Sequence, residues 1–348
     1  MFLQELAEAR GVAGHEQAVR ELVLNAIKPW IDTHRVDALG NLICLRRARG
    51  QPTEQGPRKV MLAAHMDEVG LMITGINSDG TLRFGPVGGI DPRVLLSKQV
   101  LVGDDAVPGV IGARPIHLTT PADRERVVEL DKMAIDIGVT SKSAAEKKVK
   151  LGDYVSFRTT FEVLDTEGLR TVKGKAMDDR IGCYVLTELL KTDYAFDLYA
   201  VFTAQEEVGL RGAKVAAYAI NPDLALVFEG TVCDDIPKDK DISPVTELGK
   251  GPALTFMDRS VIADPRLVRL LVRTAERLGI PYQFKRAIAG GTDAGAIHLT
   301  REGVPSAVIA VASRYIHAPV SMVSLNDVDH TIQLAREALH TLEGGLEA

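Results

Sequence analysis

The sequence has few cysteines, few aromatic side chains and no long apolar run. Its 348 residues include three cysteines and one tryptophan, and aromatic residues make up 5% of the chain. The cysteines, Cys44, Cys183 and Cys233, are odd in number and lack the spacing of a CxxC motif or a disulfide framework. Such cysteine usage is typical of a reducing compartment, so we expect a cytoplasmic protein without disulfides.

Neither a membrane nor a nucleic acid is expected as a partner. The best apolar stretches, residues 224–228 and 304–312, are far shorter than the roughly 20 residues that cross a bilayer. The first residues, Met1 to Glu5, show neither the basic start nor the apolar run of a signal peptide. The chain has 41 Lys and Arg against 47 Asp and Glu, and the net charge of −6 argues against nucleic acid and against an anionic membrane surface.

The pattern of apolar segments predicts an α/β protein, with a mostly parallel sheet flanked by helices and an inserted small β-barrel. After about residue 170, strands and helices alternate, which is typical of a parallel sheet. Between about residues 70 and 165, short β-like runs are separated by Gly, Pro and Asp. We therefore expect an α/β catalytic domain in two parts, residues 1–69 and 166–348, and a β-rich domain inserted as residues 70–165. The main helices are expected at 16–28, 180–191, 264–278 and 326–342, and the main strands at 42–45, 60–64, 198–203, 224–228 and 306–312.

Five apolar strands are each followed by residues that can bind metal ions. In open α/β sheets the functional crevice lies at the carboxyl ends of the strands, so these residues should converge if the strands are parallel neighbours. Two imidazoles with several carboxylates and no thiolate suit Zn²⁺, Co²⁺ or Mn²⁺. One catalytic ion needs about three protein ligands. The number of candidate ligands here is larger and fits two ions that share a carboxylate. The five places hold His65 with Asp67, Asp178 with Asp179, Glu206 with Glu207, Glu229, and His317.

Each of these places also has a structural interpretation when it is taken alone. A histidine at a strand end, such as His65, is more often a hydrogen-bonded structural residue than a metal ligand. The Asp178-Asp179 pair can cap a helix, and the Glu206-Glu207 pair can lie in a solvated loop. Because five separate strand ends would all have to carry ligand-type residues by chance, their combination favours a metal site.

The order of these residues and the sequences around them resemble the TET (tetrahedral) aminopeptidases, a group of co-catalytic metallo-aminopeptidases. The group includes glutamyl, leucyl, lysyl and deblocking enzymes, and some members have been labelled endoglucanases. The resemblance covers essentially the whole chain. Its motifs are AAHMDEVG at residues 63–70, AMDDRIG at 176–182, QEEVGLRGA at 205–213, GGTDAG at 290–295 and RYIHAP at 314–319.

The resemblance implies a role for each ligand-type residue. Asp178 would bridge two divalent ions. His65 and Glu229 would complete one metal site, and Glu207 and His317 would complete the other. The ions would be Zn²⁺ or Co²⁺, with Mn²⁺ as a further option.

Further positions follow from the same resemblance. Asp67 would accept a hydrogen bond from the distal nitrogen of His65. Asp179 would lie just outside the ligands, and its peptide bond with Asp178 can be cis in relatives. Many relatives have Asp where Glu229 stands, and the longer side chain changes the geometry of that site.

The resemblance also implies self-association. The segment between His65 and Asp178 is long enough for an extra domain, and TET enzymes carry a β-rich dimerisation domain there. Their dimers typically build a hollow tetrahedron of twelve subunits, so we expect a homo-oligomer of this kind.

The expected activity is the hydrolysis of N-terminal residues from short peptides. Two ions would acidify a water, and Glu206 would act as the general base that takes its proton and returns it to the leaving amine. The alternatives are a carboxypeptidase or deacylase with the same metal chemistry, a glycosidase with paired carboxylates, and a metal-binding or assembly protein without activity. The sequence leaves the preferred N-terminal residue open, because acidic, basic and aliphatic preferences all occur in the group.

Overall fold

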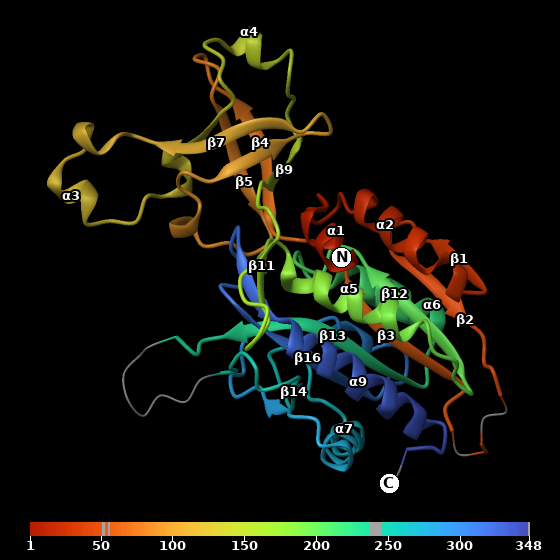
Figure 1. The fold of residues 1–348 in the computed structure, drawn as a ribbon. Helices are drawn as coiled ribbons and strands as arrows, with labels where there is room; N and C mark the ends of the chain where they lie inside the picture. Colours follow the sequence, from red (N-terminus) through yellow and green to blue (C-terminus); the bar gives the residue numbers. More distant parts are fainter. Residues whose placement is uncertain (51–52, 55, 237–244, 347–348) are drawn as a thin grey trace.

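The protein has two parts, a body built on a large sheet and a β-barrel that projects from one end of it (Figure 1). The structure is a computed structural model that describes residues 1–50, 53–54, 56–236 and 245–346. The helices are α1 (Phe2–Glu8), α2 (Gln17–Ile27), α3 (Pro121–Arg124), α4 (Lys142–Ala145), α5 (Met177–Leu189), α6 (Arg211–Ile220), α7 (Pro265–Leu278), α8 (Ala294–Ile297) and α9 (Leu325–Leu342).

In the described part of the chain, the sheet of the body has eleven strands and is mixed. Its main path runs β1-β2-β12-β3-β13-β16-β17-β11-β10, with β14 and β15 added beside β16. The four central strands, β12, β3, β13 and β16, are parallel, and the other strands of the main path join antiparallel. Beside β16, β14 pairs antiparallel with it, and β15 pairs parallel with β14. The strands are β1 (Thr33–Val36), β2 (Leu42–Arg46), β3 (Lys59–His65), β10 (Glu162–Val163), β11 (Thr171–Gly174), β12 (Asp197–Thr203), β13 (Leu224–Cys233), β14 (Ala253–Thr255), β15 (Gln283–Phe284), β16 (Ser306–Arg314) and β17 (Ser321–Ser324).

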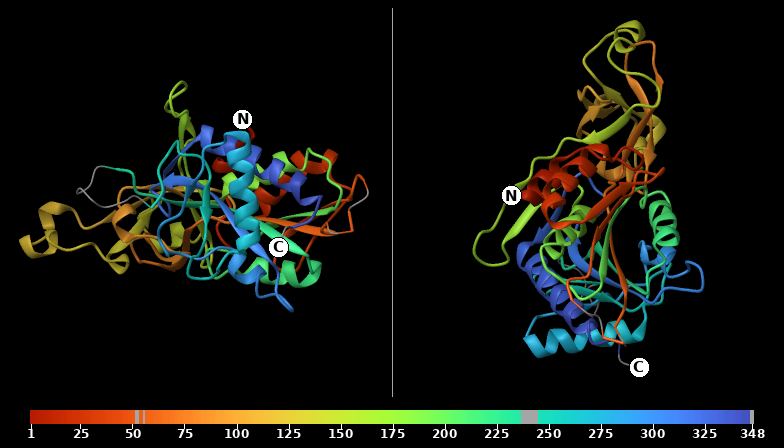
Figure 2. Two further views of the ribbon diagram at one scale, coloured as in Figure 1. Left: turned by 90° about the horizontal axis from the view of Figure 1, so that it is seen from below. Right: turned by 90° about the vertical axis from the view of Figure 1, so that its right-hand side faces the viewer.

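Helices cover both faces of this sheet, which is why its central strands are mostly apolar (Figure 2). Alternate residues of β3 show the division. Val60, Leu62 and Ala64 pack into the core shared with α1, α2, α5, α7 and α9. Met61 and Ala63 pack into the second core, which α6 and α8 cover. A strand buried on both faces leaves its carboxyl end as the place where polar side chains can reach solvent.

The barrel is closed and antiparallel, in the order β4-β5-β8-β7-β6-β9. It has its own apolar core, which includes Leu71, Ile73, Val100 and Val155. Its first strand begins at Gly70, directly after the motif that ends β3. Its strands are β4 (Gly70–Ile76), β5 (Leu82–Val87), β6 (Gln99–Val102), β7 (Val107–Ala113), β8 (Met133–Asp136) and β9 (Tyr154–Phe157).

The structure confirms the α/β class, the inserted barrel and the main helices. Helix α7 begins at Pro265 after the Asp264 cap and ends before Gly279, which has a φ of 66°. One expectation about the sheet is wrong. The segment before Asp178 is not a parallel neighbour of the other four strands, because β11 pairs antiparallel with β17.

Among the described residues, no helix is both long and apolar enough to cross a membrane.

Candidate metal centre

The predicted ligands meet at the carboxyl ends of the parallel strands. His65 is the last residue of β3, and Glu229 lies inside β13 at the point where that strand passes beyond β3. Glu207 follows β12, and His317 follows β16. Asp178 arrives by a different route, at the N-terminal end of α5, where the Asp178-Asp179 peptide is cis. Five separate segments therefore deliver one cluster.

The carboxylate of Asp178 lies between the two histidines. Its Oδ1 is 3.2 Å from Nε2 of His65, and its Oδ2 is 3.4 Å from Nε2 of His317. Each oxygen therefore faces a different histidine, which is the arrangement that a carboxylate shared by two ions requires. Nε2 of His317 is also 3.6 Å from Oε2 of Glu207, and Nε2 of His65 is 3.0 Å from Oε1 of Glu229.

Main-chain carbonyls set which nitrogen of each histidine faces the cluster. Nδ1 of His65 lies 3.0 Å from the carbonyl oxygen of Asp67, and Nδ1 of His317 lies 2.8 Å from that of Gly89. A carbonyl can only accept, so Nδ1 donates in both rings and Nε2 is left to bind a cation. Gly89 follows β5 of the barrel, so the inserted domain orients one of the two histidines.

The carboxylate of Asp67 contacts the backbone after β12 as well as the ring of His65. Its carboxylate lies 3.5 Å from Nδ1 of His65, farther than its own carbonyl oxygen. The two carboxylate oxygens accept hydrogen bonds from the backbone N–H groups of Glu206, at 2.9 Å, and Glu207, at 3.0 Å. Asp67 is fully buried. The expected contact with His65 is therefore made chiefly by the backbone, and the side chain positions the Glu206-Glu207 pair.

Asp179 and Glu206 flank the predicted ligands in different ways. The carboxylate of Asp179 accepts from the backbone N–H groups of His65, at 3.1 Å, and Gly182, at 2.9 Å. Oε2 of Glu206 lies 3.9 Å from Nε2 of His65, and none of the described residues donates a hydrogen bond to it, so the carboxylate is available to a water. Glu206 thus adjoins the cluster without making its closest contacts.

The pKa values of the clustered side chains indicate that the buried carboxylates lack enough neighbouring positive charge to balance them. Burial raises the pKa of Glu207 to about 7 and raises the pKa values of Glu206 and Glu229 well above their usual range. The hydrogen bond with Asp178 raises the pKa of His317 to about 10. Burial acts against the ionised form of Asp178, yet the two histidines lower its pKa. Cations placed among these carboxylates would lower their pKa values.

The residues present fit a pair of divalent cations. His65, Asp178 and Glu207 can each place a ligand atom within 4.8 Å of the others, and so can His65, Asp179 and Glu229. Oε2 of Glu229 is buried and has no hydrogen-bond partner in the described residues. A buried carboxylate oxygen without a donor is costly unless a cation binds it. Imidazole and carboxylate donors match zinc, cobalt or manganese.

A cavity of about 460 Å³ opens in front of the cluster. Gly290, Gly291 and Thr292, from the GGTDAG motif, form one side of it. The chemistry of this cavity is acidic, because four carboxylates of the cluster line it. Its lining also includes Leu210, Val232, Lys285, Ala289 and Ile316.

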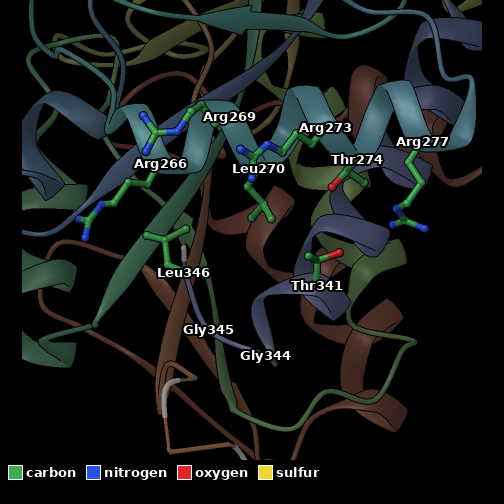
Figure 3. A pocket seen from close by; sticks show the side chains of 10 residues that line it. All are labelled: Arg266, Arg269, Leu270, Arg273, Thr274, Arg277, Thr341, Gly344, Gly345 and Leu346. Carbon is green, nitrogen blue, oxygen red and sulfur yellow. The ribbon is translucent and has the colours of Figure 1, made fainter. Parts of the chain in front are cut away.

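A second hollow, of about 290 Å³, lies between α7 and the end of α9 (Figure 3). It is lined by four arginines of α7, of which Arg266 pairs with Asp264 at 2.8 Å and Arg277 with Glu337 at 4.0 Å. Among the described residues that line it there is no carboxylate or histidine, so these residues offer no side chain that would hold a cation or act as a general base.

Two residues near the site were not found from the sequence. Glu16, at the start of α2, is buried and accepts from the backbone N–H of Gln205 at 3.1 Å, next to the proposed base. Lys285, after β15, lines the cavity. Neither lies in a recognisable motif. Each is brought to the site by contacts between segments that are far apart in the sequence.

Comparison with known proteins gives consistent results along the whole chain. Residues 40–334 match the family described as M42 glutamyl aminopeptidase. The chain is 34% identical to the lysyl aminopeptidase of Pyrococcus furiosus over 350 residues, which covers 98% of this chain and 97% of that protein. Its fold matches a TET aminopeptidase from a marine sediment archaeon of the Thaumarchaeota with a TM-score of 0.92 and 36% identity, covering 99% and 97% of the two chains.

A second solved structure adds information on assembly. The TET1 peptidase of Pyrococcus horikoshii matches with a TM-score of 0.83 and 35% identity, over 97% of this chain and 98% of that chain. That peptidase can assemble into a tetrahedron or a large octahedral shell. The resemblance noted from the motifs is therefore confirmed by sequence and by fold.

Proposed function

Because the chain belongs to the M42 glutamyl aminopeptidase family, and is thus an aminopeptidase, we propose that it removes N-terminal residues from short peptides with two divalent ions and a glutamate base. The observation that carries this proposal is the position of Asp178, whose two oxygens face His65 and His317 separately. One ion would be held by His65, Asp178 and Glu229, and the other by Asp178, Glu207 and His317. When bound, such ions acidify water and polarise a carbonyl group.

In this mechanism Glu206 moves the proton. It takes a proton from the attacking water and delivers it to the amine that leaves. Its carboxylate lies within the cavity, and Asp67 fixes its backbone. Burial keeps its pKa high, which suits a group that must both accept and release a proton.

The substrate would enter through the 460 Å³ cavity with its free α-amine toward the acidic cluster. Four carboxylates at the closed end attract a cationic or metal-binding amine. An acylated N-terminus has lost that group, so the arrangement favours peptides with a free N-terminus. A carboxypeptidase or a deacylase would not require this amine.

We also propose that the chain self-associates through its barrel, by analogy with the relatives that form shells. The segment between β7 and β8 exposes three large apolar side chains, Ile116, Leu118 and Val127, each more than half accessible to solvent. Exposed apolar groups on one projecting segment are typical of an interface. A dimer, and from it a tetrahedron of twelve subunits, would cover them.

The decisive experiment uses aminoacyl p-nitroanilides, their N-acetylated forms and C-terminally amidated tripeptides. We expect hydrolysis only of substrates with a free α-amine, loss of activity with a chelator, and recovery with Zn²⁺, Co²⁺ or Mn²⁺. Equal hydrolysis of the N-acetylated forms would reject the aminopeptidase mechanism. Activity on a cellulose oligosaccharide that persists in chelator would support the glycosidase alternative instead.

A further inference from the structure

The segment 204–207, which carries the proposed base, donates all of its backbone N–H groups to buried side chains. It lies between β12 and α6, and Glu206 is its third residue. In order along the segment, the acceptors are Oδ1 of Asn41 at 2.9 Å, Oε1 of Glu16 at 3.1 Å, and the two carboxylate oxygens of Asp67 at 2.9 and 3.0 Å. All three of these side chains are buried. Four successive donors held in this way fix the path of the segment.

Asn41 ties the two ends of the loop between β12 and α6 together. Its Oδ1 accepts from Ala204, and its Nδ2 donates to the carbonyl oxygen of Gly212, in the first turn of α6, at 2.9 Å. The N–H of Gly212 donates in turn to the carbonyl oxygen of Ala204 at 3.0 Å. The packing is tight, because a Cβ atom at Gly212 would lie 2.2 Å from Oδ1 of Asn41. Three hydrogen bonds therefore close the loop at its ends.

Glu16 supports the residue directly before the proposed base. Gln205 has a φ of 59°, in the left-handed region that residues other than glycine rarely adopt, so its surroundings must hold it there. Oε1 of Glu16 accepts from the N–H of Gln205 and also from the N–H of Gly14, at 2.6 Å. Both hydrogen bonds use the same oxygen, so a glutamine side chain can keep both of them.

Neither Asn41 nor Glu16 is placed to take part in the chemistry itself. Among the described residues, neither lines the cavity and neither belongs to a candidate group of metal ligands. Their contacts with the loop are made to its backbone N–H groups. An effect of these two side chains on the reaction must therefore pass through the position of the loop.

We propose that Asn41 and Glu16 are positioning residues for the proton-transfer step, because they hold the backbone from which the carboxylate of Glu206 reaches the attacking water. This inference rests on the proposed function, in which Glu206 is the base. A reacting group displaced by about 1 Å can lower a rate by about 10²-fold, even when the changed residue is remote from the chemistry. The segment that precedes the first metal ligand thus sets the turnover of a site to which it contributes no ligand.

The first test measures kcat and KM of Glu16→Met and Glu16→Gln with the aminoacyl p-nitroanilide that the wild type hydrolyses fastest. Glu16→Met removes the acceptor, and kcat should fall by about 10–100-fold while KM stays near its wild-type value, because the cavity lining is unchanged. Glu16→Gln keeps the acceptor and should retain most of the wild-type kcat. Asn41→Ala should resemble Glu16→Met. Equal losses of kcat in Glu16→Gln and Glu16→Met would reject the role of the hydrogen bond.

Two control variants in α2 separate positioning from a general loss of stability. Val23→Ala removes buried apolar atoms from the same helix, so it should lower the melting temperature and leave kcat unchanged. Glu21→Met replaces an exposed carboxylate and should change neither quantity. If Val23→Ala lowers kcat as much as Glu16→Met does, loosening of the fold explains both losses and the proposal is overturned.

A double-mutant comparison shows whether the effect passes through Glu206. The base is absent in Glu206→Gln, so the addition of Glu16→Met should cause no further fall in kcat. Losses that multiply would contradict the proposal, because Glu16 would then act on another part of the site.

The proposed function and this inference fail in different ways. A wild type that hydrolyses no aminoacyl substrate, or a Glu206→Gln variant with normal turnover, would reject the assigned base and the inference together. Wild-type kcat in Glu16→Met and Asn41→Ala, beside a Glu206→Gln variant that has lost turnover, would reject the inference alone. The Glu16 variants decide the question by themselves if Asn41→Ala does not fold.

Discussion

The carboxylate of Asp67 accepts a hydrogen bond of 2.9 Å from the backbone N–H of Glu206, and its other oxygen accepts from the N–H of Glu207. One buried aspartate thus fixes both the proposed base and a proposed ligand. The contact spans two strands, since Asp67 follows β3 and the glutamates follow β12. The placement of the proposed base relative to the proposed ligands therefore depends on hydrogen bonds from the carboxylate of Asp67, which is neither a proposed ligand nor the proposed base.

Asp67→Asn should keep the shape of this side chain but lose one of its two acceptors. The amide NH₂ of Asn would face a backbone N–H, and an unpaired buried donor costs about 1–3 kcal/mol. We expect a lower melting temperature and a kcat reduced more strongly than KM is raised, because the base is displaced while the cavity remains. Thermal unfolding and steady-state kinetics measure both effects. An unchanged kcat would show that the loop keeps its position without Asp67.

Glu206→Gln should abolish proton transfer while leaving the metal site intact. The amide has the size of the carboxylate but cannot act as a base, so kcat should fall by about 10²–10⁴-fold or more. Metal analysis should still find about two ions per subunit, because Glu206 is not among the proposed ligands. The matched control is Gln205→Glu, which changes the neighbouring side chain outside the cavity lining. Near-normal turnover of Glu206→Gln would reject its role.

The two histidines should differ in their effect on metal content. His317→Ala should remove one ion, leave about one per subunit and keep the fold, since the ring is 42% exposed. His65→Ala should remove its own ion, weaken the second site and lower stability, because His65 is buried and its loss leaves a void beside Asp178, the carboxylate proposed to be shared by both ions. Elemental analysis and calorimetry test this. Equal loss of metal in the two variants would contradict the assignment of one histidine to each ion.

Lys175 should make stability depend on pH in a defined range. Burial lowers its pKa from 10.5 to about 8, against the attraction of Glu68, whose oxygens lie 2.6 and 2.8 Å from Nζ. Below about pH 8 both the folded and the unfolded chain hold the proton, and the cost of burying the ammonium is fully present. Between about pH 8 and 10.5 the unfolded chain binds more protons, so the free energy of unfolding contributed by Lys175 rises with pH, by up to about 1.4 kcal/mol per unit.

This dependence is measured as the difference between the wild type and Lys175→Met in urea unfolding at each pH. The difference is needed because other buried groups titrate in the same range in the unfolded chain. Burial raises the pKa of Cys44 to about 12, for example, which acts in the opposite direction. A difference that stays constant from pH 7.5 to 10.5 would contradict the lowered pKa of Lys175.

The sequence predicted the candidate site best where a short stretch of consecutive residues determined the local structure. β3 is an unbroken apolar strand that ends at His65, and such a pattern specifies both the strand and the position of its last residue. The segment before Asp178 was wrongly expected to be a parallel neighbour of the other strands. Its strand β11 pairs antiparallel with β17, and this pairing depends on contacts between residues far apart in the chain. The carbonyl oxygen of Asp67 lies closer to Nδ1 of His65 than the carboxylate does, and this backbone contact could not be predicted because a main-chain carbonyl has no sequence signal. Lys285 could not be distinguished from other surface lysines before the fold placed it on the cavity wall.

The bond between Nδ1 of His317 and the carbonyl of Gly89 makes the barrel part of the proposed catalytic site. A shortened chain that kept the α/β body and omitted the barrel would retain every proposed ligand, yet His317 would lose the acceptor that selects its tautomer. The insertion therefore cannot be exchanged as an independent module, and its presence in the chain is a condition for the ring to present Nε2 to a metal.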